Sequence, residues 1–346
     1  MIGGLISSLV PKGKMPKIHI PKALMLLCVL AVAVLSFFPV LKIIVYFADD
    51  LGIWTTVNAV LFSFETGKAW LWTLGLSASL FAILLTNNLN ESPKALLYLS
   101  LALVLSMILA LAWGGHAASL NKWGGFAAHT AHFLAISVWI GVMFVIGWFR
   151  KNQENWLEFL KWYTPLAVVC LFVTIVAGLF MMEFIVPSYF QSWMISYGQA
   201  LLIKHLLIVP LVTFALINGF LIKRRLQKEP AFDPSKWVRA ESIVALAIFG
   251  ITAYMGQQEP PHTLTPSLPV EQASPWFLTL YQGMFNPAKE LGLSFNETSF
   301  ILGFVALLFL ILILLAYLKK IPTYFAVGMS VLFVAAGYLS LMTALQ

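Results

Sequence analysis

Long apolar segments constrain this chain more than any other feature. Several of them exceed the roughly 18–20 residues that a helix needs to span a bilayer, and they run continuously instead of alternating as barrel strands do. Only 10% of the residues are charged, against about 25% in soluble domains. We therefore predict an all-α, polytopic transmembrane helical bundle of about nine spans, at about 22–48, 69–86, 95–114, 126–149, 163–186, 198–222, 239–256, 297–318 and 322–344.

The basic residues between these spans are distributed unevenly. The segments before the first span and after the second, fourth, sixth and eighth spans hold 16 of the 21 Lys and Arg residues, counted along the printed sequence. Positively charged loops stay on the cytoplasmic side, so this pattern predicts a cytoplasmic N-terminus and an extracytoplasmic C-terminus. It also accounts for the net charge of +7. We therefore expect a lipid bilayer, and no nucleic acid, as the chain's surroundings.

The spacing of the spans predicts four regions. These are a cytoplasmic segment 1–21, a seven-span core 22–256, an external loop 257–296 with an interfacial aromatic segment, and a two-span C-terminal extension 297–346. No cleavable signal peptide is evident, and both cysteines lie inside apolar spans, so no disulfide framework is expected. The sequence carries no Walker A motif, and we expect no enzymatic activity.

Histidines gather on one side of the predicted membrane. Five of the six lie on the external side: His116 at the outer end of the third span, His129 and His132 in the fourth, His205 in the sixth, and His262 beyond the seventh. Histidine is costly in hydrocarbon and is a common metal ligand. His129 and His132 are three residues apart and share a helix face. The pattern predicts a metal site formed by His116, His129, His132 and His205.

Thioethers lie near these imidazoles and favour one metal. Met181, Met182 and Glu183 fall in the last outer turns of the fifth span, and Met255 ends the seventh. Imidazole with thioether suits copper, as Cu(I) or Cu(II), whereas zinc more often binds carboxylate or thiolate beside histidine. Those four residues, with His262 and Lys204, are possible accessory residues. Lys204 would repel a cation unless Glu183 pairs with it.

Other interpretations remain open from the residues alone. Single methionines in membrane helices are mostly packing residues, and a histidine near a helix end can simply bind water. Two histidines on facing helices, such as His132 and His205, could instead hold haem b in an electron carrier. A copper-delivery factor for oxidase assembly is a third possibility. On the inner side, Arg239 and Glu241 are expected to form an interfacial ion pair.

Four motifs stand out along the predicted spans. They are Gly114-Gly-His-Ala, His132-x-x-Ala-x-x-x-Trp-x-Gly, Tyr197-Gly-x-x-Leu-Leu-x-Lys with Asn218 beyond it, and Arg239-x-Glu followed by Pro260-Pro261. Together they resemble the motifs of the CopD (PcoD) family of copper-resistance membrane proteins. They occur in the family's order and cover about residues 95–262.

The resemblance implies uptake or transport of copper at the bacterial cytoplasmic membrane, with a CopC-like external copper donor as a possible partner. The chain departs from the pattern in three ways. We expect no CopC domain in it, residues 257–346 extend it, and His205 stands where the family usually has an apolar residue.

Overall fold

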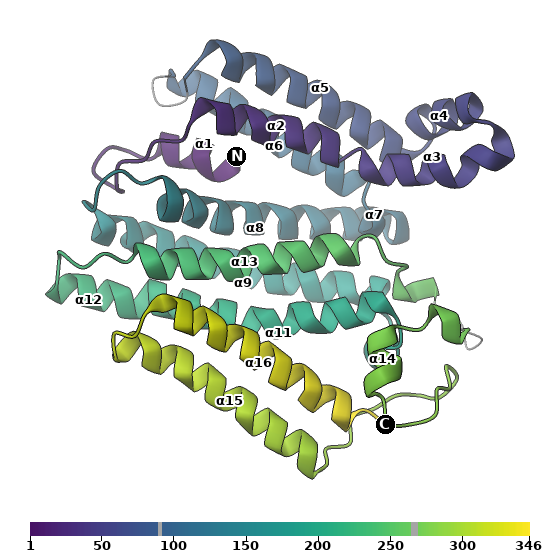
Figure 1. Cartoon of the computed structure of the whole chain (residues 1–346). Helices are drawn as coiled ribbons and strands as arrows, with labels where there is room; N and C mark the ends of the chain where they lie inside the picture. The colour runs from purple at the N-terminus through teal and green to yellow at the C-terminus, as the bar shows by residue number, and fades with distance from the viewer. Residues whose placement is uncertain (89–91, 264–268) are drawn as a thin grey trace. The chain divides into compact units, whose positions relative to one another are not determined.

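The computed structural model describes residues 1–88, 92–263 and 269–346. Over these ranges the chain is helical, and its β-structure is limited to two isolated bridges. Nine described segments are long and apolar enough to cross a membrane, which confirms the predicted all-α polytopic bundle (Figure 1). They are α2–α3 (Lys22–Leu35 and Phe38–Leu51), α5 (Glu65–Thr86), α6 (Lys94–Trp113), α8 (Lys122–Phe149), α9 (Trp156–Ile185), α11–η1–α12 (Ser196–Leu216, Ile217–Leu221 and Ile222–Lys228), α13 (Ser235–Met255), α15 (Glu297–Leu318) and α16 (Thr323–Ala344).

Short helices connect or flank these spans. Sequence periodicity gives little signal over so few residues, and they were not expected individually. They are α1 (Ile2–Leu9), α4 (Ile53–Phe62), α7 (His116–Leu120), α10 (Tyr189–Ser192), the 3₁₀ turns η2 (Pro261–Thr263) and η3 (Val270–Gln272), and α14 (Pro275–Leu280). The first span is also interrupted, because α2 ends at Leu35 and α3 begins with Pro39 in its first turn.

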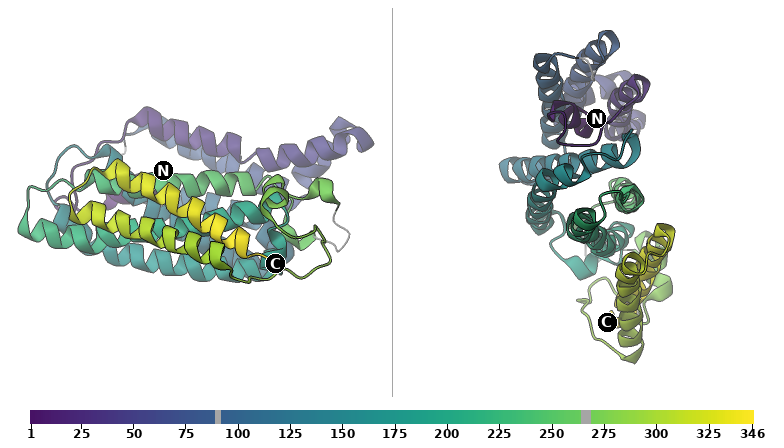
Figure 2. Two further views of the ribbon diagram at one scale, coloured as in Figure 1. Left: turned by 60° about the horizontal axis from the view of Figure 1, so that its bottom comes forward. Right: turned by 90° about the vertical axis from the view of Figure 1, so that its left-hand side faces the viewer.

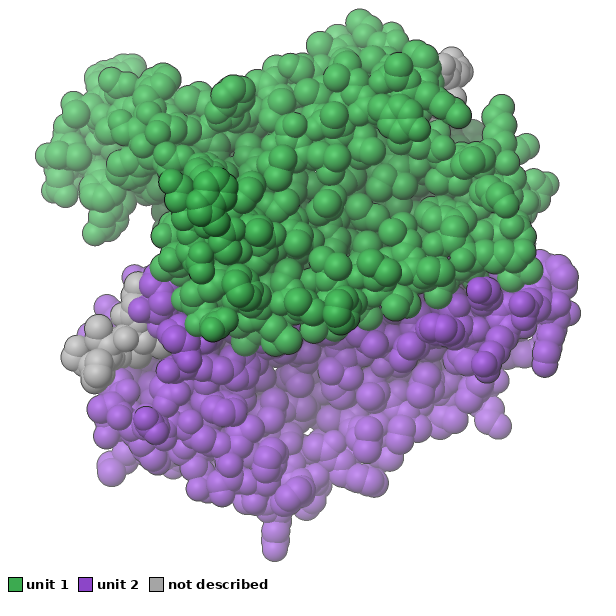
Figure 3. Space-filling view, turned by 180° about the vertical axis from the view of Figure 1, so that it is seen from behind, with its two compact units in different colours: residues 1–184 green, residues 185–346 purple. Residues whose placement is uncertain are grey.

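The chain divides into two compact units, Met1–Phe184 and Ile185–Gln346, coloured separately in Figure 3. The C-terminal helices α15 and α16 run antiparallel and side by side (Figures 1 and 2) and belong to unit 2 together with α11 and α13. Between α13 and α15, Phe277 of α14 is fully buried in a core cluster with Trp193 and Met342. The expected external loop therefore contributes directly to the core of unit 2.

Hydrogen bonds define the two ends of unit 1. At one end, the backbone of Lys17 and His19 pairs with Lys151 and Phe149, where α8 ends. Lys22 at the start of α2 donates to the carbonyl of Leu85 near the end of α5. These contacts place three predicted cytoplasmic segments at one end of the bundle. The predicted external ends of α5, α6 and α8 meet at the other end.

The helix α1 packs inside unit 1 although it belongs to the predicted cytoplasmic segment. Leu5 is fully buried, and the helix lies against α6 and α8. A Cβ atom on Gly3 would lie 2.0 Å from the carbonyl oxygen of Gly141, so only glycine permits this crossing. The chain therefore begins with a short buried helix that is joined to α2 by residues bonded to the end of α8.

Candidate metal centre

A glycine turn between α6 and α8 supports the predicted external end of unit 1. Trp113 ends α6 and donates from Nε1 to Glu65 Oε2 at 2.7 Å, while Lys122 lies over its ring. The hydroxyl of Thr66 donates to the carbonyl of Gly114. Beyond α7, the side chain of Asn121 accepts from the backbone of Gly124 and caps α8. These bonds hold α5, α6, α7 and α8 together around the Gly-Gly-His turn.

The ring of His129 lies directly against this turn. A Cβ atom built on Gly115 would be 2.7 Å from His129 Nδ1, so a larger residue at position 115 would displace the imidazole. The ring also stacks with that of Phe133 on the same helix. Its Nδ1 atom is buried without a hydrogen bond of ordinary geometry, and the ring interacts with the backbone of Ala112 near the end of α6. Because buried polar atoms without such a hydrogen bond are rare in folded proteins, this nitrogen is a candidate ligand atom.

His116 begins α7, immediately after Gly115, and its side chain is exposed. The glycine that packs against the His129 ring is therefore adjacent in sequence to a second, accessible imidazole. The structure brings the backbone of His116 and the ring of His129 to the same turn. Sequence spacing could not indicate this approach, although the paired glycines before His116 were a signal for it.

His132 faces a different neighbour. Its Nδ1 lies 2.9 Å from the carbonyl oxygen of Thr174 on α9, and the ring passes close to Gly178. A carbonyl can only accept, so Nδ1 carries the proton, and in the neutral ring the lone pair is on Nε2. Metal-binding histidines are commonly oriented by such a bond. The two rings three residues apart thus lie against different helices, α6–α7 for His129 and α9 for His132.

The other residues of unit 1 that the sequence analysis considered differ in how deeply they are buried. Met181 and Met182 are half-buried near the end of α9, and Glu183 is exposed. Deeper in α8, Met143 is buried among core residues, as a packing role predicts.

The remaining predicted residues belong to unit 2. His205 Nδ1 lies 2.8 Å from the hydroxyl of Tyr189, a partner that the sequence did not indicate. A tyrosine hydroxyl is protonated at neutral pH, and burial raises the pKa of Tyr189 further, to about 12. Lys204 and His262 are half-buried, and Met255 is buried at the end of α13. The predicted pairing of Lys204 with Glu183 stays a prediction.

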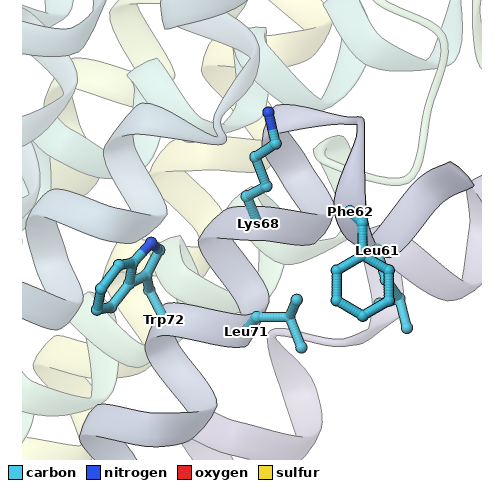
Figure 4. A pocket seen from close by; sticks show the side chains of 5 residues that line it. All are labelled: Leu61, Phe62, Lys68, Leu71 and Trp72. Atoms are coloured by element: carbon cyan, nitrogen blue, oxygen red, sulfur yellow. The ribbon is translucent and has the colours of Figure 1, made fainter. Parts of the chain in front are cut away.

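Within the described ranges, no group of three or more His, Cys, Asp or Glu side chains stands at metal-binding distance. The predicted ligands therefore remain predictions. Glu241 is buried in α13 and accepts a hydrogen bond from Asn218, and Arg239 is exposed; the expected ion pair of Arg239 with Glu241 stays a prediction. A shallow pocket of about 270 Å³ between α4 and α5 contains none of the predicted ligands, and its size is below that of ordinary ligand sites (Figure 4). Its lining residues are Leu61, Phe62, Lys68, Leu71 and Trp72.

Two family models match separate parts of the chain. Residues 2–126 match the model described as "Copper resistance protein D-like, N-terminal domain", and residues 157–255 match "Copper resistance protein D". They begin at α1, farther toward the N-terminus than the motifs indicated, and end at the last residue of α13; residues 127–156, with His129 and His132, lie between the two matches. The chain thus belongs to the CopD-type family and is a multi-pass membrane protein.

A relative with a curated name is the "Copper transport protein CutJ" of Bacillus subtilis (strain 168). It is 27% identical to this chain over 229 residues. The match covers 62% of this chain and 40% of the relative, so the chain spans less than half of that protein's length. No solved structure matches the chain.

Proposed function

We propose that this protein binds copper at the external end of unit 1 and takes it up or transports it from the outer face of the bacterial cytoplasmic membrane. The observation that carries the proposal is the buried Nδ1 of His129, which has no hydrogen bond of ordinary geometry and lies against the turn bearing His116. Membership of the CopD-type family and the name of the related copper transport protein support copper as the cargo.

The donor chemistry suits this cargo. Imidazole nitrogens bind both common oxidation states of copper, and thioethers stabilise Cu(I). His116 is accessible to an arriving ion, and His129 offers a nitrogen farther inside the helix bundle. His132, oriented by the Thr174 carbonyl, can act as a further ligand once the ion passes inward. Met181 and Met182 at the end of α9 are accessory thioethers in this scheme.

The charge distribution supports an external position for the proposed copper site. The end of unit 1 where Lys22, Arg150 and Lys151 lie is the cytoplasmic end under the positive-inside rule. The Gly-Gly-His turn is then external and could receive copper from a CopC-like donor, the partner that the family resemblance implies. We propose that His205, with Met255 and His262 as accessory residues, binds copper within unit 2.

The decisive experiment is metal analysis of the purified protein together with its optical spectrum. Binding of about one copper ion without a Soret band supports the proposal. A Soret band would establish the haem b alternative, to which the comparisons give no support. Uptake of copper into sealed vesicles then separates a transporter from a delivery factor for oxidase assembly, because a delivery factor binds copper without accumulating it inside.

A further inference from the structure

A buried amide and a buried carboxyl face each other in unit 2, outside the proposed copper site. Asn218 Nδ2 donates to Glu241 Oε2 at 2.7 Å and to the backbone carbonyl of Trp237 at 3.2 Å. Glu241 is 3% exposed and Asn218 is 6% exposed. Both residues lie in helices long and apolar enough to span the membrane. Ionisable residues in such positions are rare and commonly functional.

The amide orientation follows from its two acceptors. Reversing the amide would direct its oxygen at the Trp237 carbonyl, and two acceptors repel each other. In the observed orientation, Asn218 Oδ1 is buried without a hydrogen-bond partner. A buried amide oxygen that accepts no hydrogen bond lowers the stability of the folded protein by about 1–3 kcal/mol. Asn218 Oδ1 can therefore accept one more hydrogen bond. It lies beside Nδ2 of the same amide, which already donates to the Glu241 carboxyl group.

The backbone explains how Asn218 reaches this position. Residues Ile217–Leu221 form a π-helical turn between α11 and α12. Such a turn accommodates an extra residue in the helix, and π-turns are frequent at functional sites. Asn218 on the π-turn reaches Glu241 in the second turn of α13. The side chains thus meet near the end of unit 2 where the basic residues of α12 lie.

We propose that Glu241 and Asn218 form a proton-binding site within the membrane-spanning part of unit 2. A proton added to the carboxylate gives a carboxylic acid, whose carbonyl oxygen keeps the bond from Asn218 Nδ2. The new O–H donates to Asn218 Oδ1 and completes a two-point pairing of acid and amide. No other bond forms or breaks, and release of the proton restores the carboxylate.

A proton fits this pair better than a metal cation does. Hard cations such as Mg²⁺ and Ca²⁺ bind six or more oxygen atoms, and copper prefers nitrogen and sulfur. Nearby oxygens are already engaged: the Trp237 carbonyl accepts from Asn218, and the Ser242 hydroxyl donates to the Val238 carbonyl. A proton needs only one oxygen to carry it and a second to accept its hydrogen bond.

Charged and titratable groups surround this end of unit 2 and set the local field. Arg239 lies on α13 itself, and Arg225 at the end of α12 pairs with Glu229. Tyr317 of α15 packs its ring on Trp237. From α16, Tyr324 is exposed. These groups influence the pH at which Glu241 binds a proton. They are the same in all the variants compared below.

The test is an infrared difference titration of the full-length protein reconstituted in lipid. The wild type is expected to show a carboxylic acid C=O band that disappears as pH rises, and Glu241→Gln is expected to lack it. Asn218→Leu is expected to shift the band and move the titration midpoint by about one pH unit or more. Glu271→Gln, at an exposed glutamate of η3, should leave the band unchanged.

Two results from these variants would overturn the proposal. One is a wild-type spectrum in which no titrating band is lost by Glu241→Gln. The other is an Asn218→Leu spectrum with unchanged band and midpoint. Replacing potassium by sodium at constant pH must also leave the band unchanged, since a sodium-dependent change would identify a metal-cation site instead.

The link to transport rests on the proposed function and has its own readout. In proteoliposomes, a pH gradient should stimulate copper uptake by the wild type, while Glu241→Gln should lose that stimulation and keep its copper affinity. Equal stimulation of both proteins would reject a coupling role for Glu241. If no variant accumulates copper, the proposed transport fails, whereas the infrared result still decides the proton site.

Discussion

At the scale of single residues, the candidate copper site depends on how side chains meet their neighbours. The sequence indicated that His129 and His132 share a helix face, and the structure directs their rings to α6–α7 and α9. Helical spacing indicates roughly in which direction a side chain points from the helix axis. It does not identify the neighbouring helix that the side chain meets. The Thr174 carbonyl and the Gly115 approach could therefore be found only from the fold.

The first prediction concerns the two histidines of α8. His129→Ala or His132→Ala should each weaken copper binding about tenfold or more while the protein remains folded, because each removes an imidazole from the site. Copper affinity measured by competition with a chelator checks this. His19→Ala, an exposed histidine bonded through its backbone to the other end of α8, should bind copper normally. Unchanged affinity in both α8 variants would remove this site.

The second prediction concerns Gly115. Gly115→Ala places a methyl group 2.7 Å from His129 Nδ1, so the ring must shift. We expect a loss of stability of about 1–3 kcal/mol and a loss of copper affinity comparable to that of His129→Ala. Thermal unfolding and the same competition assay measure the two effects. Gly75→Ala is the control, since a Cβ atom there meets nothing within 4 Å; equal behaviour of the two variants would contradict the packing argument.

At the scale of elements, long apolar runs predicted the spans well and the short helices poorly. All nine predicted spans correspond to candidate membrane helices, because a run of some twenty apolar residues has few alternative structures. The helices α1, α4 and α7 carry only a few turns each, and their stability comes from packing. The π-turn at Asn218 could not be predicted from the sequence either, because one extra residue in a helix leaves the composition unchanged.

The third prediction tests the packing of α1. Gly3→Val should displace α1 from α8, because even a single Cβ atom would lie 2.0 Å from the Gly141 carbonyl oxygen. Hydrogen exchange of the backbone amides in residues 2–9 should become faster, while exchange in α15 and α16 stays unchanged. Gly13→Ala is a matched glycine change outside α1, where the positive φ causes strain but nothing lies within 4 Å. Protected amides in Gly3→Val would refute the close crossing.

At the scale of the whole molecule, the comparisons establish the family and the residues supply the proposed chemistry. The motifs indicated a resemblance over about 95–262, and the matched regions extend it to the N-terminal helices. Composition and the lengths of the apolar runs thus predicted the class of fold, and the resemblance of the motifs predicted the family. They did not reveal the division at Phe184, since domain boundaries depend on which helices pack together.

The fourth prediction is the topology. Reporter fusions or cysteine labelling should place the N-terminus and the connection between α8 and α9 in the cytoplasm, and the C-terminus and α7 outside. A cysteine at the exposed position Ser119 of α7 should react with a membrane-impermeant reagent in intact cells, and one at the exposed position Lys151 should not. The reverse labelling pattern would place the histidines on the cytoplasmic side and exclude uptake from outside through this site.

The crossing of Gly3 and Gly141 has a consequence for biosynthesis. These residues are 138 positions apart, from 141 − 3, so a ribosome needs roughly ten seconds to make the second after the first. During that interval α1 lacks its contact with α8, and α2 through α6 enter the bilayer before α8 does. The packing of α1 against α8 therefore waits for the fourth span, and a nascent chain stopped short of it would leave α1 open to proteases.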